Sequence, residues 1–188
     1  MLKIKALSED NNLLLVNFDC TPKSGDITEE ELKEYAELNE FFQDDAYNYQ
    51  LQLLAKTYLV INTNTEELIA AFSLSNDKIE KNNKLSRVIP NDKRMPYYPA
   101  VKIARLAVSS PFQSYGYGAM ILNYLANNFA STNNKTGCRF ITLDAIPSAN
   151  HFYKKYNFKE IASYSKKGKC FMAMDLIPFT KKSAVSDK

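Results

Sequence analysis

Hydrophobic and polar positions alternate along the chain in short blocks. The apolar runs predict strands at Leu13–Phe18, Tyr58–Ile61, Leu68–Leu74, Ala100–Ser109, Arg139–Asp144 and Cys170–Leu176. The polar stretch Asn62–Glu67 is typical of the turn in a β-hairpin. The polar, basic segment Asp77–Pro96 predicts an exposed loop.

Helical periodicity fills most of the remaining chain. We predict helices over Ile27–Gln43, Asp44–Leu54, Tyr117–Asn128 and Ser148–Tyr156. Thr28 and Glu31 have the spacing of a capping box at the start of the first helix. The inward stripe of the third is expected to be Met120, Ile121, Tyr124, Leu125 and Phe129.

This alternation shows no repeat and no internal linker. It predicts one α+β (α/β) domain with a central mixed, mostly antiparallel sheet flanked by helices. A length of 188 residues fits a single domain with a substantial core. We expect the domain to occupy residues 1–179 and residues 180–188 to form a polar, disordered tail.

Composition narrows the class of protein. A net charge of +3 does not by itself indicate a nucleic-acid partner, and clustered lysines near the end are typical of a solvated surface. No apolar run approaches the roughly 20 residues that cross a bilayer, and the N-terminus lacks a signal core. We therefore expect a cytoplasmic protein with no membrane partner. One histidine and three widely spaced cysteines, Cys20, Cys138 and Cys170, predict reduced thiols and no metal site.

The stretch Gln113–Gly118, of sequence Gln-Ser-Tyr-Gly-Tyr-Gly, carries the strongest chemical signal. It follows a predicted strand and precedes a predicted helix, and it holds two of the five glycines. Glycine admits positive φ and a close ligand, and the free N–H groups of a helix start favour a phosphate. The spacing alone fits a tight turn without a ligand equally well.

Its surroundings add weight to the phosphate interpretation. The run Arg105–Val108 followed by Gln113-x-x-Gly116-x-Gly118 resembles the acyl-coenzyme A loop of the GCN5-related N-acetyltransferases (GNAT). Ala149–Phe158 resembles that superfamily's Ala-x-x-Phe-Tyr-x-x-x-Gly-Phe, with Asn157 in the glycine place. Asn tolerates left-handed φ better than most residues.

The resemblance implies the GNAT fold, with parallel fourth and fifth strands that splay apart to admit acetyl-coenzyme A. It implies an N-acetyltransferase whose co-substrate binds at Leu106, Ala107, Val108, Gln113, Ser114, Tyr115, Gly116, Tyr117, Gly118 and Ala119. The strand residues would pair with the amide groups of the pantetheine arm, and a backbone N–H near Ala107 would polarise the thioester.

The resemblance also places at Tyr153 the tyrosine that protonates the departing thiolate. Simple ring packing is the alternative for Tyr153, Tyr156 is its rival as the acid, and His151 points to a different helix face. Asp144 can orient a substrate amine or serve as a turn or cap residue. No glutamate stands where a base is expected, which suits an α-amine that is already partly neutral at pH 7.

The stretches Tyr98–Val108, Leu143–Ala145, Leu38–Gln43 and Thr57–Val60 are similar to the acetyltransferase toxins of bacterial toxin–antitoxin pairs. That likeness implies aminoacyl-tRNA as the acceptor, an antitoxin as a partner and a homodimer. A basic track through Lys102, Arg105, Lys154 and Lys155 would favour RNA. An enzyme for a small amine or a protein N-terminus, and a coenzyme-binding module without catalysis, stay open.

Overall fold

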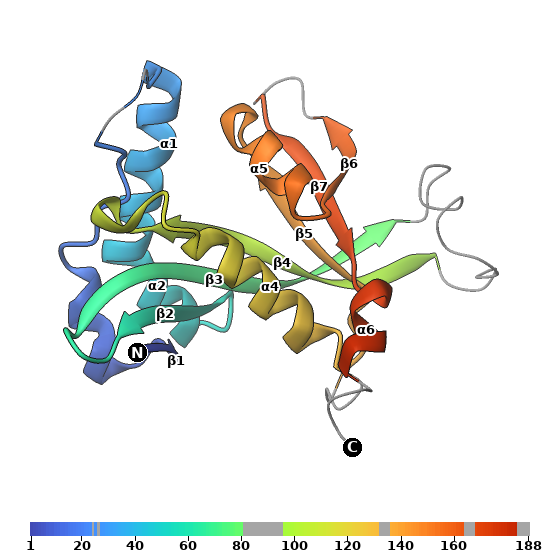
Figure 1. Cartoon of the computed structure of the whole chain (residues 1–188), viewed down its shortest axis with the longest axis horizontal. Coiled ribbons are helices and arrows are strands. Elements are labelled where there is room, and N and C mark those ends of the chain that lie inside the picture. The colour runs from blue at the N-terminus through green and yellow to red at the C-terminus, as the bar shows by residue number, and fades with distance from the viewer. Residues whose placement is uncertain (24, 26, 81–95, 132–135, 164–167, 184–188) are drawn as a thin grey trace. The chain divides into compact units, whose positions relative to one another are not determined.

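The computed structural model describes residues 1–23, 25, 27–80, 96–131, 136–163 and 168–183. Its seven-stranded sheet has the hydrogen-bonded order β1-β2-β3-β4-β5-β7-β6 (Figure 1). The strands are β1 (Leu2–Ala6), β2 (Lys56–Asn62), β3 (Glu67–Glu80), β4 (Tyr97–Val108), β5 (Phe140–Ala145), β6 (Lys159–Ser163) and β7 (Cys170–Asp175). β4 and β5 run parallel, whereas β1–β2, β2–β3, β5–β7 and β6–β7 are antiparallel. The predicted mixed sheet is confirmed.

The α-helices of the described residues are α1 (Glu29–Glu40), α2 (Ala46–Leu51), α4 (Tyr117–Phe129), α5 (Asn150–Lys155) and α6 (Ile177–Ser183). Short 3₁₀ segments are η1 (Glu9–Leu15), η3 (Ser110–Phe112) and η4 (Pro147–Ala149), and η2 (Phe41–Asp45) is a π-turn. The predicted capping box starts α1: Glu31 N–H donates to Thr28 Oγ1 at 3.2 Å, and Thr28 N–H donates to Glu31 Oε2 at 3.0 Å.

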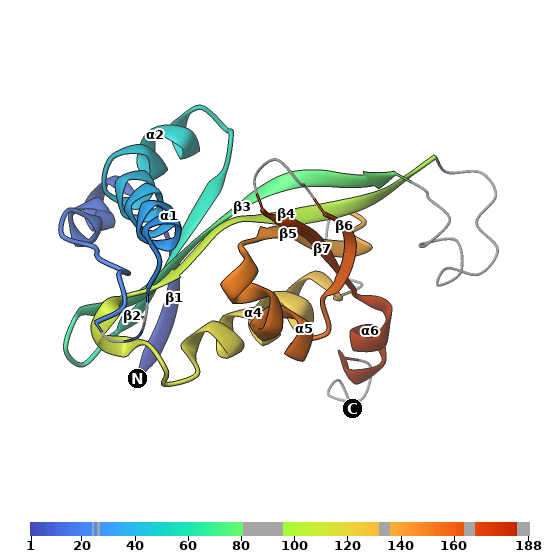
Figure 2. The ribbon, with the colours of Figure 1, turned by 90° about the horizontal axis from the view of Figure 1, so that it is seen from above.

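The chain divides into two compact units, and each has its own core. The first consists of Met1–Ser75 and Ile103–Ile121. Within it, α1 and α2 lie on one face of β1, β2 and β3 (Figure 2). Its buried cluster contains Leu7, Leu15, Phe18, Cys20, Phe41, Phe42, Ala46, Leu59, Ile61, Ala71 and Ala107.

The second unit consists of Asn76–Lys102 and Leu122–Lys188. Here α5 and the second half of α4 lie on one side of β5 and β7 (Figure 2). Strand alternation turns the buried Ile141, Leu143, Met172 and Met174 to that side. The opposite face carries a second cluster, made of Ile79, Tyr98, Ala100, Phe140 and Ala173.

Two sequence expectations about strands are wrong. Leu13–Phe18 is not a strand, because η1 starts earlier, where Ser8 N–H donates to Asn11 Oδ1 at 2.8 Å. Burial of Leu15 and Phe18, with Leu13 exposed, follows a spacing of three rather than two. The predicted loop Asp77–Pro96 begins as strand, since β3 continues to Glu80, and residues 81–95 lie outside the described part.

Two expectations about helices are also corrected, one for the buried face of α4 and one for the start of the C-terminal tail. In α4, Ile121 and Leu125 are buried as predicted, but Tyr124 is 40% exposed and the small Ala126 is buried beside them. The chain from Thr180 to Ser183 is the end of α6 rather than tail, while residues 184–188 lie outside the described part.

Candidate functional site

The glycine loop belongs to the first unit and connects β4 to α4. After Val108 the chain makes the turn η3 and reaches Gln113 in an extended conformation. Ser114 and Gly116 then take left-handed backbones, with φ of +67° and +84°. Left-handed residues of this kind occur in anion-binding nests, in which successive N–H groups face one ligand.

The N–H groups of this loop are available to a ligand. No backbone N–H from Ser114 to Ala119 donates to a backbone acceptor among the described residues. The first bond of α4 comes from Met120 N–H, which donates to the Gly116 carbonyl at 3.0 Å. The free donors and the positive helix end lie at one point of the chain, as a phosphate site requires.

The side chain of Gln113, predicted to bind the cofactor, holds the loop in place. Its amide donates to the carbonyls of Cys20 at 2.7 Å and Val108 at 3.2 Å. Ser110 N–H also donates to the Asp19 carbonyl at 2.8 Å. The segment Asp19–Cys20 is thus a support of the loop that sequence reasoning missed, and no local pattern marks it.

The strand residues predicted to bind the pantetheine arm lie at the end of β4. Ala107 is buried, whereas Leu106 and Val108 are half-buried. β4 pairs with β5 only over Ala100–Lys102, with Lys102 opposite Thr142. The expected parallel pairing of strands four and five is confirmed, and the pairs of β4 with β5 end at Lys102.

Tyr153 lies on α5 in the second unit, among other aromatic rings. Its ring centroid is 5.2 Å from that of Phe152 and 5.6 Å from that of Phe158, both edge-on. Burial raises the pKa of its hydroxyl to about 12, so this group carries its proton at neutral pH. Tyr156 packs on Phe152 at 5.1 Å.

The turn after α5 has the backbone that the motif requires. Asn157 takes φ of +67°, and the following Phe158 N–H donates to the Tyr153 carbonyl at 3.1 Å. Phe158 is then buried, with its ring edge-on to the ring of Tyr153. Asn therefore does here what the usual glycine does.

The predicted polar residues are only partly brought together. Lys102 Nζ lies 2.6 Å from Asp144 Oδ2, so Asp144 is an ion-pair partner rather than a cap. Lys154 lies 3.9 Å from Glu160, and Lys155 and His151 are exposed. Arg105, in the first unit, stacks over the Phe41 ring at 5.0 Å.

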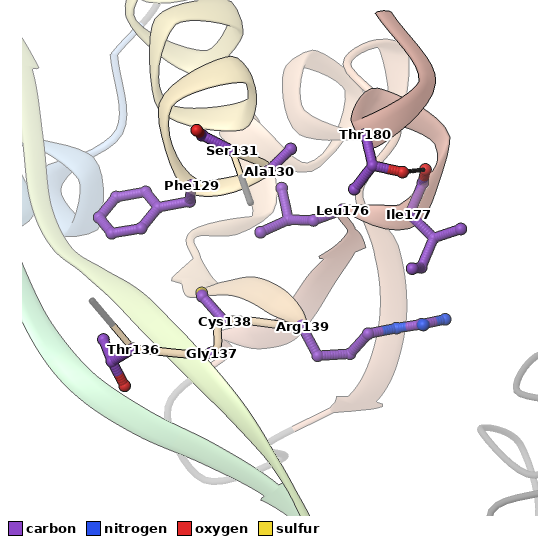
Figure 3. A pocket seen from close by; sticks show the side chains of 10 residues that line it. All are labelled: Phe129, Ala130, Ser131, Thr136, Gly137, Cys138, Arg139, Leu176, Ile177 and Thr180. Atoms are coloured by element: carbon purple, nitrogen blue, oxygen red, sulfur yellow. Dashed lines mark hydrogen bonds between the residues drawn. The ribbon is translucent and has the colours of Figure 1, made fainter. Parts of the chain in front are cut away.

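A cavity of about 280 Å³ occupies a different part of the second unit, between the end of α4, the start of β5 and α6 (Figure 3). None of the residues predicted for chemistry lines it. Its lining consists of Phe129, Ala130, Ser131, Thr136, Gly137, Cys138, Arg139, Leu176, Ile177 and Thr180.

The three cysteines are free thiols. Burial raises the pKa of Cys20 to about 12 and also raises that of Cys138, so neither is an activated thiolate. Within the described residues, no three His, Cys, Asp or Glu side chains gather as metal ligands. None of the described helices is long and apolar enough to cross a membrane.

Comparison with known proteins gives a family and a set of folds. The family model described as "Acetyltransferase (GNAT) domain" matches residues 23–178. No curated protein matches the sequence. A crystal structure described as a bacterial toxin matches at 16% identity and TM-score 0.76, covering 100% of this chain and 97% of that chain.

Two further structures describe the toxin AtaT. One is AtaT complexed with acetyl-methionyl-tRNAfMet, at 19% identity and TM-score 0.71, covering 100% of both chains. The other is a tyrosine-to-phenylalanine mutant bound to the C-terminus of the antitoxin AtaR and acetyl-CoA, at 19% identity and TM-score 0.67, covering 100% of this chain and 99% of that chain. Identities this low establish a shared fold.

Proposed function

The chain belongs to the GNAT family of acyl-coenzyme A-dependent acyltransferases, and we propose that it moves the acetyl group of acetyl-coenzyme A to a primary amine. The observation that carries the proposal is the row of free N–H groups from Ser114 to Ala119 at the start of α4. These donors bind the coenzyme's pyrophosphate, and Leu106–Val108, which has no pairs with β5, binds its pantetheine amides along that edge as a further strand would.

The transfer needs one acid from the chain. The amine nitrogen forms a bond to the acetyl carbonyl carbon, and the carbon–sulfur bond breaks. The Tyr153 hydroxyl gives its proton to the departing sulfur, the nitrogen releases a proton to water, and the phenolate recovers a proton from water. The Tyr153 hydroxyl carries its proton at neutral pH, so it can act as the donor.

The acceptor that we propose is the α-amine of aminoacyl-tRNA. The full-length fold match to AtaT, solved with acetyl-methionyl-tRNAfMet, supports it. An α-amino group, with a pKa of about 7.7–8.0, is partly neutral at pH 7 and needs no strong base. A lysine side chain near 10.4 would need one.

Two protein partners belong to the same proposal. An antitoxin is supported by the AtaT structure bound to the C-terminus of AtaR. A homodimer would bury apolar side chains at and just after the end of α2, where Leu51 is 63% and Leu53 92% exposed. Sedimentation of the isolated chain measures the oligomeric state, and a monomer at all concentrations contradicts the dimer.

Thiol release tests the function. Acetyl-coenzyme A is offered with aminoacyl-tRNA, polyamines and N-terminal peptides, and tRNA should be acetylated best. Tyr153→Phe should keep coenzyme affinity by calorimetry and lose about 10²–10⁴ in kcat. Tyr156→Phe is the matched control and should stay within about threefold of the wild type.

The opposite pattern transfers the acid role to Tyr156. Full activity in both variants removes tyrosine from the mechanism. Turnover of small amines or peptides without tRNA favours the metabolite or N-terminal enzyme, and coenzyme binding without any turnover favours the non-catalytic module.

A further inference from the structure

Four polar side chains gather where the pairing of β4 with β5 ends. Lys102 and Thr142 form the last residue pair, and Asp144 follows two residues along β5. Asp77 comes from β3, on the other side of β4. By alternation, Thr142 and Asp144 share the face of Phe140, which is opposite to the face covered by α5.

The contacts within this group occupy one oxygen of Asp77 and one oxygen of Asp144. Thr142 is fully buried, and its hydroxyl donates to Asp77 Oδ2 and lies 3.5 Å from the Val101 carbonyl. Asp144 receives Lys102 Nζ on Oδ2 at 2.6 Å. No described residue donates to its other oxygen, Oδ1.

The ion pair is accessible from solvent. The side chains of Lys102 and Asp144 are 32% and 30% exposed, and a pair this exposed is worth little to stability. Asp77, Lys102 and Asp144 together carry one excess negative charge. One more cation that donates hydrogen bonds would balance this charge.

We propose that Asp144 binds the ammonium form of the acceptor amine, which gives one proton to water before its nitrogen attacks the thioester, and that Lys102 is a positioning residue for the Asp144 carboxylate. The inference rests on the proposed function, because it assigns the acceptor end of the same reaction. A carboxylate accepts about four hydrogen bonds, so Oδ1 can take the ammonium while Lys102 keeps Oδ2. Acetylation makes the nitrogen neutral and removes its attraction to Asp144, which favours release of the product.

Direct binding of a small α-amine probe tests this without turnover. The full-length chain, ¹⁵N-labelled and saturated with coenzyme A, is titrated with L-methioninamide, and N-acetyl-L-methioninamide is the uncharged control ligand. Amide shifts at Thr142–Ala145 should report the charged probe. Asp144→Asn should weaken its binding at least tenfold and leave coenzyme affinity unchanged.

Asp175→Asn is the matched control variant. Asp175 also forms an ion pair, 2.8 Å from Arg139, and it lies at the opposite end of the β5–β7 ladder, beside Phe140. It should bind the probe like the wild type. Lys102→Gln should weaken binding less than Asp144→Asn does, and Lys102→Arg should restore it.

In steady-state assays, the acceptor KM should rise at least tenfold in Asp144→Asn, with kcat within about threefold. An unchanged acceptor KM and unchanged probe affinity in this variant overturn the inference, while thiol release by the wild type upholds the function. Probe binding that depends on Asp144 without any thiol release upholds the inference and contradicts the function. Equal binding of the acetylated probe also overturns the inference.

Discussion

At the scale of single residues, the proposed chemistry depends on residues that the sequence suggests by motif. Tyr153 follows from the Phe-Tyr stretch, and Asn157 was expected to tolerate left-handed φ, which it has. The state of the Tyr153 hydroxyl was not predictable, because its raised pKa results from burial among groups that only the fold assembles. The ion pair of Asp144 with Lys102, 42 residues away, was equally invisible.

The raised pKa of Tyr153 makes a prediction about stability at high pH. An unfolded tyrosine ionises near pH 10, and this one ionises at about 12 in the folded chain. Between these values the unfolded chain binds fewer protons, so the free energy of unfolding falls as pH rises. This contribution to the free energy of unfolding is fully present below pH 10. About 1 kcal/mol of it is lost by pH 11.

Urea unfolding at pH 8, 9.5 and 11 measures this loss of unfolding free energy. The decline should be shallower in Tyr153→Phe than in the wild type by about that amount. Other buried tyrosines and Cys20 contribute equally to both proteins and cancel in the difference. Parallel declines in the two proteins would mean that the hydroxyl is as solvated in the folded as in the unfolded chain.

At the scale of elements, the sequence predicted those that are set by neighbouring residues. It did not predict those that depend on pairing or packing with distant parts of the chain. The loop at Gly116, the capping box of α1 and the β2–β3 hairpin follow from residues close in sequence. The sequence did not predict β1 or β6. β1 is a largely exposed strand that is stabilised by pairing with β2, and β6 is stabilised by pairing with β7. The apolar run that begins at Leu13 was wrongly predicted as a strand, because only the residues on one side of the 3₁₀ helix η1 contact the core.

The glycine loop makes the prediction that belongs to this scale. Gly118→Asp places a carboxylate among the N–H donors and should weaken acetyl-coenzyme A binding at least tenfold by calorimetry. An acidic side chain in the first turn of a helix interacts favourably with the helix dipole, so the melting temperature of the variant should not fall. Gly137→Asp makes the same chemical change at a glycine outside the loop, where an added Cβ meets no atom within 4 Å, and should bind normally.

Loss of binding together with loss of the melting transition would indicate unfolding instead. Unchanged binding in a folded Gly118→Asp protein would remove the loop from the proposed site. The test therefore separates a phosphate cradle from a tight turn, which the spacing of the two glycines alone did not.

At the scale of the whole chain, the sequence predicted the fold class through its order of elements and two motifs. It could not predict the contacts that close long loops, such as Gln113 with Cys20, 93 residues apart. Such contacts depend on which surfaces meet after folding, and no local spacing encodes them. An acceptor as large as a tRNA would also be recognised at this scale, because it would contact many residues at once.

Salt dependence is the whole-molecule prediction for an RNA substrate. Each phosphate neutralised by a lysine adds about 0.7–0.9 to the slope of log affinity against log salt. If Lys154 and Lys155 contact phosphates, their double Ala variant should lower that slope by about 1.5 and weaken tRNA acetylation at low salt. Lys3 and Lys5 are equally exposed, so their double Ala variant controls for the loss of two charges.

The measurement is the KM for total aminoacyl-tRNA at several salt concentrations, with coenzyme affinity followed in parallel. The Lys154 and Lys155 variant should keep its coenzyme affinity, because the proposed phosphate cradle of the coenzyme is built from backbone N–H groups at Ser114–Ala119. A KM that is independent of salt, and equal in both double variants, contradicts an RNA acceptor. The acceptor is then a small amine or a peptide, for which the charge of Asp144 outweighs any distant lysine, since salt screens exposed charges beyond about 10 Å.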